Sequence, residues 1–170
     1  MKTRVSVVQG DITRVAVDAI VDAANSALRR GGGVDGAIHA AAGPELQAEL
    51  DRIGGCPTGE CRLSRGHRLP APWIIHAVGP VWHGGTAGED ALLDSCYRNA
   101  FALARRHGLA SLAFPAISTG IYGFPKDRAT RIAVTAVLDG LAQDDAVREV
   151  LFVCFDAEMA DLYRMELAAR

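Results

Sequence analysis

Long apolar runs, a strong net charge and a complete set of metal-binding cysteines are all missing from this chain of 170 residues. No segment approaches the roughly 20 apolar residues of a membrane span, and the apolar run Val5–Val8 is too short for the core of a secretory signal. The formal net charge of −2 creates no field that would draw the chain onto nucleic acid. We therefore expect a cytoplasmic protein whose main partner is neither a membrane nor a nucleic acid.

The four cysteines form no recognisable metal site. Cys56 and Cys61 are spaced more widely than a zinc knuckle, and no second pair of cysteines or histidines completes a tetrahedral set. Disulfides are rare in a reducing cytoplasm. We expect neither a structural metal nor a disulfide.

Short apolar β-type runs alternate with helical runs along the chain, and 49% of the residues are hydrophobic. The length favours a single domain over residues 1–170. The alternation predicts an α/β domain with helices on both faces of a largely parallel sheet. Strands are expected at Val5–Val8, Ala19–Ala24, Cys61–Leu69, Trp73–Val78, Leu112–Ile117 and Glu149–Phe155. Helices are expected at Val34–Ala42, Glu45–Arg52, Glu89–His107, Lys126–Leu141 and Glu158–Ala169.

Three consecutive glycines, Gly31–Gly33, open an alanine-rich helical segment. Glycines leave backbone N–H groups accessible and allow positive φ angles, so such a loop can enclose phosphate oxygens. The loop would lie on a helix N-terminus, where the helix dipole favours an anion. Asp35 falls in the first turn, and His39 follows four residues later on the same helical face. The segment predicts a nucleotide site with a carboxylate and an imidazole beside it.

A second glycine-bearing loop, Pro115–Pro125, also joins a strand to a helix. Its small residues expose backbone donors, and Tyr122 and Phe124 offer flat apolar surfaces. Taken alone, it is equally well interpreted as an ordinary turn with two core aromatics. Because ligands bind beyond the carboxyl ends of strands in such sheets, the two loops together favour a two-sided clamp on a diphosphate.

Residues 31–36 also match the dinucleotide-binding pattern G-x-G-x-x-G literally. The loop follows only the second short strand, however, and holds Asp35 inside the pattern. The acidic residues near the expected ribose-binding position, Glu49 and Asp51, lie in a helical run rather than at a strand end. We therefore discount a Rossmann site.

Several segments, in this order and over nearly the whole chain, resemble macrodomains, and within them the MacroD-type branch. They are Gly10–Thr13, Ala19–Asn25, Gly31–His39, Cys56–Glu60, Leu69–Pro80, Leu93–Tyr97 and Ile117–Pro125. The motifs are specific in combination and weak singly. The resemblance implies a three-layer α/β/α fold around a mixed, largely parallel sheet.

The resemblance also implies a hydrolase that removes mono-ADP-ribose from ester-linked Asp or Glu of proteins and deacetylates O-acetyl-ADP-ribose. Its partners would be ADP-ribose and ADP-ribosylated proteins, no cofactor or metal would be needed, and a monomer is expected. The implied catalytic residues are Asp35, Asn25 and His39. The implied binding residues are Asp11, Ile12 and Phe155 for adenine, Gly32, Gly33, Val34, Ser118, Thr119, Gly120, Ile121 and Tyr122 for the diphosphate, and Asn25 with Asp35 for the distal ribose, over which Tyr122 would close.

One residue departs from the family pattern. Macrodomains usually have asparagine at both ends of an Asn-Ala-Ala-Asn motif, and here the first is Asp22. An ionised carboxylate accepts hydrogen bonds but donates none, so a network that needs an amide donor there must be rebuilt. The second asparagine, Asn25, is intact.

The implied roles have structural alternatives. Asp11 could cap a turn with Thr13, and Asn25 could cap the chain where it leaves its strand. Phe155 and His39 could be packing residues, and we interpret His76, inside an apolar strand, as structural.

Three other functions compete with the hydrolase: an ADP-ribose reader, a phosphatase acting on ADP-ribose 1″-phosphate, and a nucleic-acid-binding domain, which the net charge disfavours. The pairing of Asp35 with His39 favours an enzyme over a reader. The stretch 79–90 is the most loop-like part of the chain.

Overall fold

The computed structural model describes residues 4–170, so the first three residues of the expected domain lie outside it. Six strands form one sheet in the order β1-β6-β5-β2-β4-β3. All neighbouring strands are parallel except β3, which runs antiparallel to β4 at one edge. The strands are β1 (Val5–Gln9), β2 (Ala19–Ala24), β3 (Cys61–Arg65), β4 (Trp73–Val78), β5 (Ser111–Phe114) and β6 (Glu149–Cys154).

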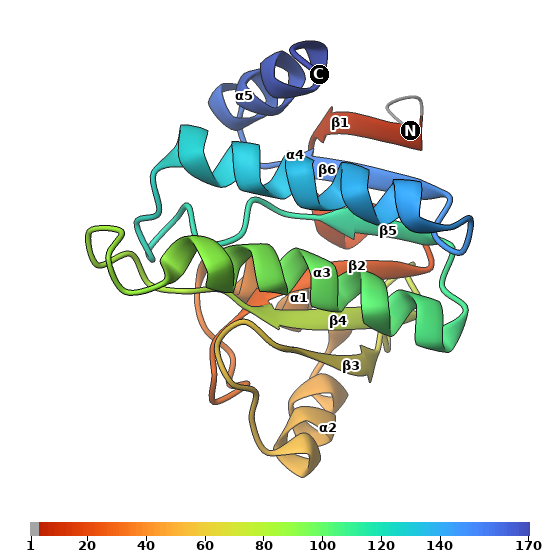
Figure 1. Ribbon diagram of the computed structural model, residues 1–170. Coiled ribbons are helices and arrows are strands. Elements are labelled where there is room, and N and C mark those ends of the chain that lie inside the picture. The colour runs from red at the N-terminus through yellow and green to blue at the C-terminus, as the bar shows by residue number, and fades with distance from the viewer. Residues whose placement is uncertain (1–3) are drawn as a thin grey trace.

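Helices cover both faces of the sheet (Figure 1). They are α1 (Gly33–Ala42), α2 (Glu45–Ile53), α3 (Glu89–His107), α4 (Lys126–Gln143) and α5 (Ala157–Ala168), with a short 3₁₀ turn, η2, at Ile12–Arg14. Alternate residues of β2 show the two layers: Val21 packs in the core beneath α3, α4 and α5, whereas Ile20 packs in the core beneath α1 and α2. The predicted three-layer α/β/α fold is confirmed.

Element ends differ from the sequence prediction where the backbone cannot continue. β5 ends at Phe114 rather than Ile117, because Pro115 has no N–H to donate to the ladder. β3 ends at Arg65, before a turn in which His67 adopts a φ of 52°. β6 ends at Cys154, so Phe155 lies just beyond the strand rather than at its end. The next residue, Asp156, caps α5 by accepting a hydrogen bond from the Met159 amide at 3.0 Å.

Gly140 lies inside α4, which continues to Gln143, beyond the predicted end at Leu141. A Cβ at Gly140 would come within 2.8 Å of the Phe101 ring on α3. This glycine therefore permits the close approach of two helices and does not end one.

The stretch 79–90 is tied to the start of α3. The Glu89 carboxylate accepts hydrogen bonds from the amides of His83, Gly85 and Ala87 at 2.7–3.0 Å. These amides lower the pKa of Glu89 to about 2. The loop is thus organised by one buried carboxylate.

Candidate functional site

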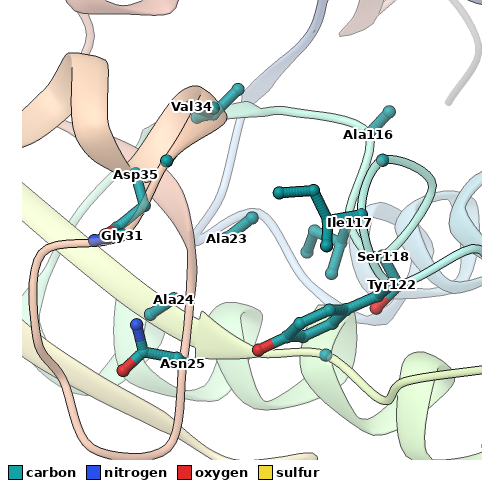
Figure 2. A pocket seen from close by; sticks show the side chains of 15 residues that line it. Ala23, Ala24, Asn25, Gly31, Val34, Asp35, Ala116, Ile117, Ser118 and Tyr122 are labelled. Carbon is teal, nitrogen blue, oxygen red and sulfur yellow. The ribbon is translucent and has the colours of Figure 1, made fainter.

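The two glycine-bearing loops meet at the carboxyl ends of the central strands and enclose a cavity of about 250 Å³ (Figure 2). One wall follows β2 and leads into α1, and the other follows β5 and leads into α4. The lining residues are Ala23, Ala24, Asn25, Gly31, Gly32, Gly33, Val34, Asp35, Gly79, Ala116, Ile117, Ser118, Gly120, Ile121 and Tyr122.

The first wall leaves helix amides open to the cavity. α1 begins at Gly33, which has a φ of 56°, and its N-cap, Gly32, offers no side chain to bond the first-turn amides. Those amides have no acceptor within the helix. They form a ready site for an anion at the positive end of the helix dipole.

The second wall includes a strained residue. Ser118 adopts a φ of 67°, and the loop holds it there because the Phe124 amide donates to the Ser118 carbonyl at 2.9 Å. The Ser118 hydroxyl is buried and has no hydrogen-bond partner among residues 4–170. A buried, unpaired hydroxyl at a cavity wall can bond a ligand oxygen without first breaking an internal bond.

Gly79, at the end of β4, lets the second wall approach the sheet. A Cβ there would come within 2.2 Å of the Ser118 hydroxyl oxygen. Gly79, Ala116 and Ile117 line the cavity although the sequence patterns did not predict them as site residues. Gly79 follows a predicted strand end, but the contact with Ser118 depends on the sheet order.

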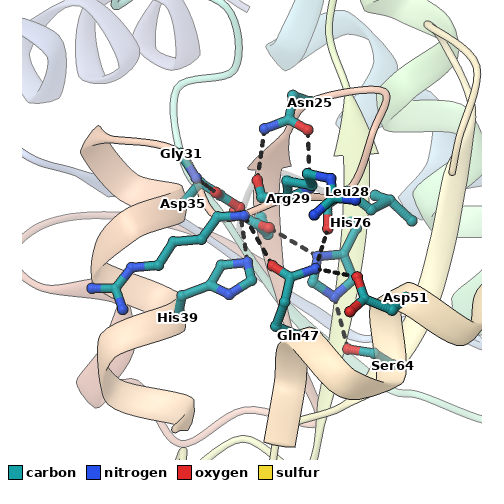
Figure 3. Close-up of polar contacts among 12 residues, drawn as sticks. Asn25, Leu28, Arg29, Gly31, Asp35, His39, Gln47, Asp51, Ser64 and His76 are labelled. Carbon is teal, nitrogen blue, oxygen red and sulfur yellow. Dashed lines mark hydrogen bonds and ion pairs between the residues drawn. The ribbon is translucent and has the colours of Figure 1, made fainter. Parts of the chain in front are cut away.

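Asp35 is the carboxylate of the cavity, only 6% exposed. Its Oδ2 accepts a hydrogen bond from the Gly31 amide at 2.6 Å, so the loop and the side chain orient each other (Figure 3). Burial, followed by repulsion from Asp22, raises the pKa of Asp35 to about 7. A carboxyl group with that pKa can both release and take up a proton near neutral pH.

His39 lies beside Asp35, with 3.6 Å between its Nε2 and the Asp35 Oδ1. It is buried, and its Nε2 has no hydrogen-bond partner among the described residues. Burial lowers its pKa. His39 does not line the cavity, so it can act on a ligand only through Asp35.

Asn25 lines the cavity but is also engaged locally. Its Nδ2 donates to the Arg29 carbonyl at 2.7 Å, and its Oδ1 accepts from the Arg29 amide at 3.1 Å (Figure 3). Asn25 therefore caps the chain after β2, as the structural alternative predicted, and also lines the cavity.

Asp11, Ile12 and Phe155 lie outside the cavity but follow neighbouring strands. The Gly10 amide donates to the Cys154 carbonyl at 3.0 Å, which places the ends of β1 and β6 side by side. Asp11 accepts from the amide and hydroxyl of Thr13, which is the turn-capping alternative. Phe155 is 86% exposed and so is not a core residue.

The remaining predicted residues, with one exception, line the cavity. Gly32, Gly33, Val34, Ser118, Gly120, Ile121 and Tyr122 line the cavity, whereas Thr119 does not. The Thr119 hydroxyl donates to the Ala116 carbonyl at 3.2 Å and so supports the turn.

The fold and site define an α/β domain with a cavity between two glycine-bearing loops at the carboxyl edge of its sheet. A family model of the Macro domain matches residues 21–133. The chain belongs to this family.

Known relatives match over nearly their full length. A macro domain-containing protein of Chlorobaculum tepidum is 53% identical over 162 residues, which cover 95% of this chain and 94% of the relative. A protein of Escherichia coli K12 named O-acetyl-ADP-ribose deacetylase is 50% identical over 167 residues, or 96% of this chain and 94% of that one.

Solved structures are similarly close. The Oceanobacillus iheyensis macrodomain with ADP superimposes with a TM-score of 0.92 at 40% identity, covering 96% of this chain and 89% of that one. The Trypanosoma brucei macrodomain in complex with ADP-ribose gives a TM-score of 0.91 at 41% identity, covering 95% of this chain and 68% of that one. Within residues 4–170, no helix is both long and apolar enough to cross a membrane.

Proposed function

We propose that this protein is a hydrolase that binds ADP-ribose and cleaves an ester at its distal ribose. The substrates would be proteins mono-ADP-ribosylated on Asp or Glu, and O-acetyl-ADP-ribose. The observation that carries this proposal is the buried carboxylate of Asp35, which lies in a cavity with an anion-binding helix start on one wall. The names of the relatives support an activity on ADP-ribose esters.

The two walls would hold the diphosphate between them. The amides of Gly32, Gly33 and Val34 would bond one set of phosphate oxygens, with Ser118 and the loop through Tyr122 on the other side. The exposed ring of Phe155 would stack on adenine, with Asp11 and the Ile12 amide at its edge. The distal ribose would then lie near Asn25 and Asp35.

In the proposed reaction, water attacks the ester and ADP-ribose leaves with a free hydroxyl. Ionised Asp35 would take the proton of the attacking water and return it to the departing sugar oxygen. A phosphate oxygen of the substrate could orient the same water. The fixed amides hold the ribose in place, which lowers the entropic cost of reaching the transition state. His39 would orient Asp35.

A reader without catalysis is the second candidate. Two observations favour it: Asn25 is engaged with Arg29, and burial leaves Asp35 partly protonated at neutral pH. A phosphatase would use the same cavity with a different leaving group.

Product analysis separates these functions. The protein is incubated with O-acetyl-ADP-ribose, with a protein mono-ADP-ribosylated on glutamate, and with ADP-ribose 1″-phosphate, while calorimetry measures ADP-ribose binding. A hydrolase releases acetate and ADP-ribose from the first substrate, and ADP-ribose from the second. Release of phosphate alone would indicate a phosphatase, and binding without any product would indicate a reader.

We further propose that the chain acts as a single-domain monomer in the cytoplasm. The described residues form one sheet with two helical layers, which supports a single domain. Light scattering of the purified protein tests the oligomeric state.

A further inference from the structure

A chain of buried polar groups extends behind Asp35, away from the cavity. Asp22 on β2 and His76 on β4 are register partners in the sheet, and both are fully buried. The Asp22 Oδ2 lies 2.8 Å from the His76 Nδ1. The Nε2 of the same ring lies 2.7 Å from the hydroxyl of Ser64 on β3, which is also buried (Figure 3).

The other oxygen of Asp22 is unpaired within the described part of the chain. Asp22 Oδ1 is buried and receives no hydrogen bond from any amide or hydroxyl of residues 4–170. The Asp35 carboxyl is the neighbouring group that acts on Asp22, since repulsion and carboxyl-to-carboxyl interaction with Asp22 both contribute to the raised pKa of Asp35. Two carboxyl groups can bond each other only when one of them carries a proton.

We propose that Asp22 is a positioning residue of this site: its buried carboxyl, held by His76, shares a proton with Asp35 and thereby sets the pH above which Asp35 can act as a base. When the proton lies on Asp22, Asp35 is an ionised base. When it lies on Asp35, the base is blocked. Two negative charges side by side in a buried site repel each other, so the pair keeps one proton to a higher pH than an isolated carboxyl group would.

The titratable groups around the pair are two histidines, one glutamate and one arginine, and the charge of His39 lowers the pKa of Asp35. His76 is the neighbour from β4, and burial lowers its pKa to about 4, so it is neutral near pH 7. His39 on α1 is shifted in the same direction by burial. Glu49 on α2 and Arg30 in the glycine loop act on these two histidines, respectively. β5, on the other side of β2, contributes no titratable residue.

The proposal rests on the proposed function only for its effect on catalysis, because the shared proton can be measured without turnover. The protein is labelled with ¹³C at the aspartate carboxyl groups, each signal is assigned through its bonds to the backbone, and all are followed by NMR from pH 4 to 9. In the wild type, the carboxyl carbons of Asp22 and Asp35 should shift together in two coupled steps. Independent titration of the two groups would overturn the proposal, and this measurement needs no variant.

Asp22→Asn supplies the second measurement, since its amide can donate to an ionised Asp35 at every pH. The titration of Asp35 should move down by about one pH unit or more, a tenfold loss of proton affinity. The control is Asp18→Asn, at the opposite end of β2, where the carboxylate bonds the Ala110 amide at 2.7 Å. That variant should leave Asp35 unchanged. An Asp35 midpoint equal in the wild type and Asp22→Asn would contradict the proposal.

Catalysis then gives a separate readout. The acid limb of kcat/KM for O-acetyl-ADP-ribose should move to lower pH in Asp22→Asn by the same amount as the NMR midpoint. A merely structural role for Asp22 would lower the rate equally at all pH values, and this result would also overturn the proposal. If neither protein turns over substrate while the NMR titrations are coupled, the proposed hydrolase fails and the shared proton stands.

Discussion

Single residues of the cavity hold conformations and contacts that cost stability when nothing is bound. Ser118 combines a positive φ with a buried hydroxyl that no described group bonds. Such features persist at sites where the rest of the loop over-determines them. They support the proposed role of the second wall in ligand binding.

Ser118→Ala should therefore affect stability and binding in opposite directions. Removing an unpaired buried hydroxyl should raise the melting temperature, whereas losing a hydrogen bond to a phosphate oxygen should weaken ADP-ribose binding about tenfold. Thermal unfolding and calorimetry measure the two effects. Ser6→Ala, an exposed position on β1, should change neither. A variant that binds ADP-ribose as tightly as the wild type would remove Ser118 from the binding site.

Phe155→Ala tests the adenine end of the site. Loss of a base-stacking ring costs about 1–3 kcal/mol, so the Kd for ADP-ribose should rise by roughly 5- to 150-fold. The Kd for ribose 5-phosphate, which lacks adenine, should not change. Met165→Ala removes another exposed apolar side chain, on α5, and should affect neither ligand. Equal weakening for both ligands would instead indicate that Phe155 supports the loop.

Residue identities were predictable to different extents. Asp35 could be placed from spacing alone, because a helix fixes the position of its first turn relative to the glycine loop. The Asp22–His76–Ser64 chain could not be predicted, because it joins three strands whose register is a property of the assembled sheet. The place of His76 inside an apolar strand predicted only a structural role for it.

At the scale of elements, close approach between β4 and the loop after β5 shapes the cavity. Gly79→Ala would place a methyl group against Ser118 and Ile117. Overpacking of this kind costs about 1–3 kcal/mol in unfolding free energy and should also weaken ADP-ribose binding. Gly120→Ala, whose Cβ meets nothing within 4 Å, is the matched control and should keep wild-type stability in chemical denaturation. Equal stability of the two variants would mean that the loop with Ile117 and Ser118 shifts to make room for the methyl group at little cost in free energy.

The sequence predicted elements better than their ends. Alternating apolar runs and helical spacing located all six strands and all five long helices of residues 4–170. The ends depended on individual groups that pattern reading does not weigh, such as the missing N–H of Pro115 and the cap supplied by Asp156. Both groups lie at loops of the proposed binding edge.

At the scale of the whole molecule, the buried carboxyl pair links folding to pH. Burial raises the pKa of Asp22 from 3.8 to about 6 in the folded protein. The folded state then binds this proton more tightly than the unfolded state, so the contribution of Asp22 to stability is lost as pH rises through that window. The side chain of Asp22→Asn does not titrate, so this variant lacks the pH-dependent contribution of Asp22.

The stability of Asp22→Asn relative to the wild type should therefore increase between about pH 4 and pH 6. Melting temperatures of the two proteins across this range give the difference directly. A difference that stays constant with pH would show that Asp22 titrates alike in the folded and unfolded states.

The order of the strands in the sheet could not be predicted from the sequence patterns either. Strands β1 and β6 lie 140 residues apart in sequence yet pair in parallel, as the register Gln9↔Cys154 shows. That pairing brings Asp11 beside Phe155 and extends the binding edge from the cavity toward the proposed adenine site. Only the family resemblance had placed these two residues together.

The central claim is that Asp35 serves the chemistry rather than the binding. The most direct test compares wild type and Asp35→Ala on a protein mono-ADP-ribosylated on glutamate, with ADP-ribose affinity measured in parallel. Because loss of a general base costs about 10²–10⁴-fold in rate, turnover should fall by that factor while the Kd stays within about tenfold. An Asp35→Ala protein that releases ADP-ribose as fast as the wild type would contradict the account.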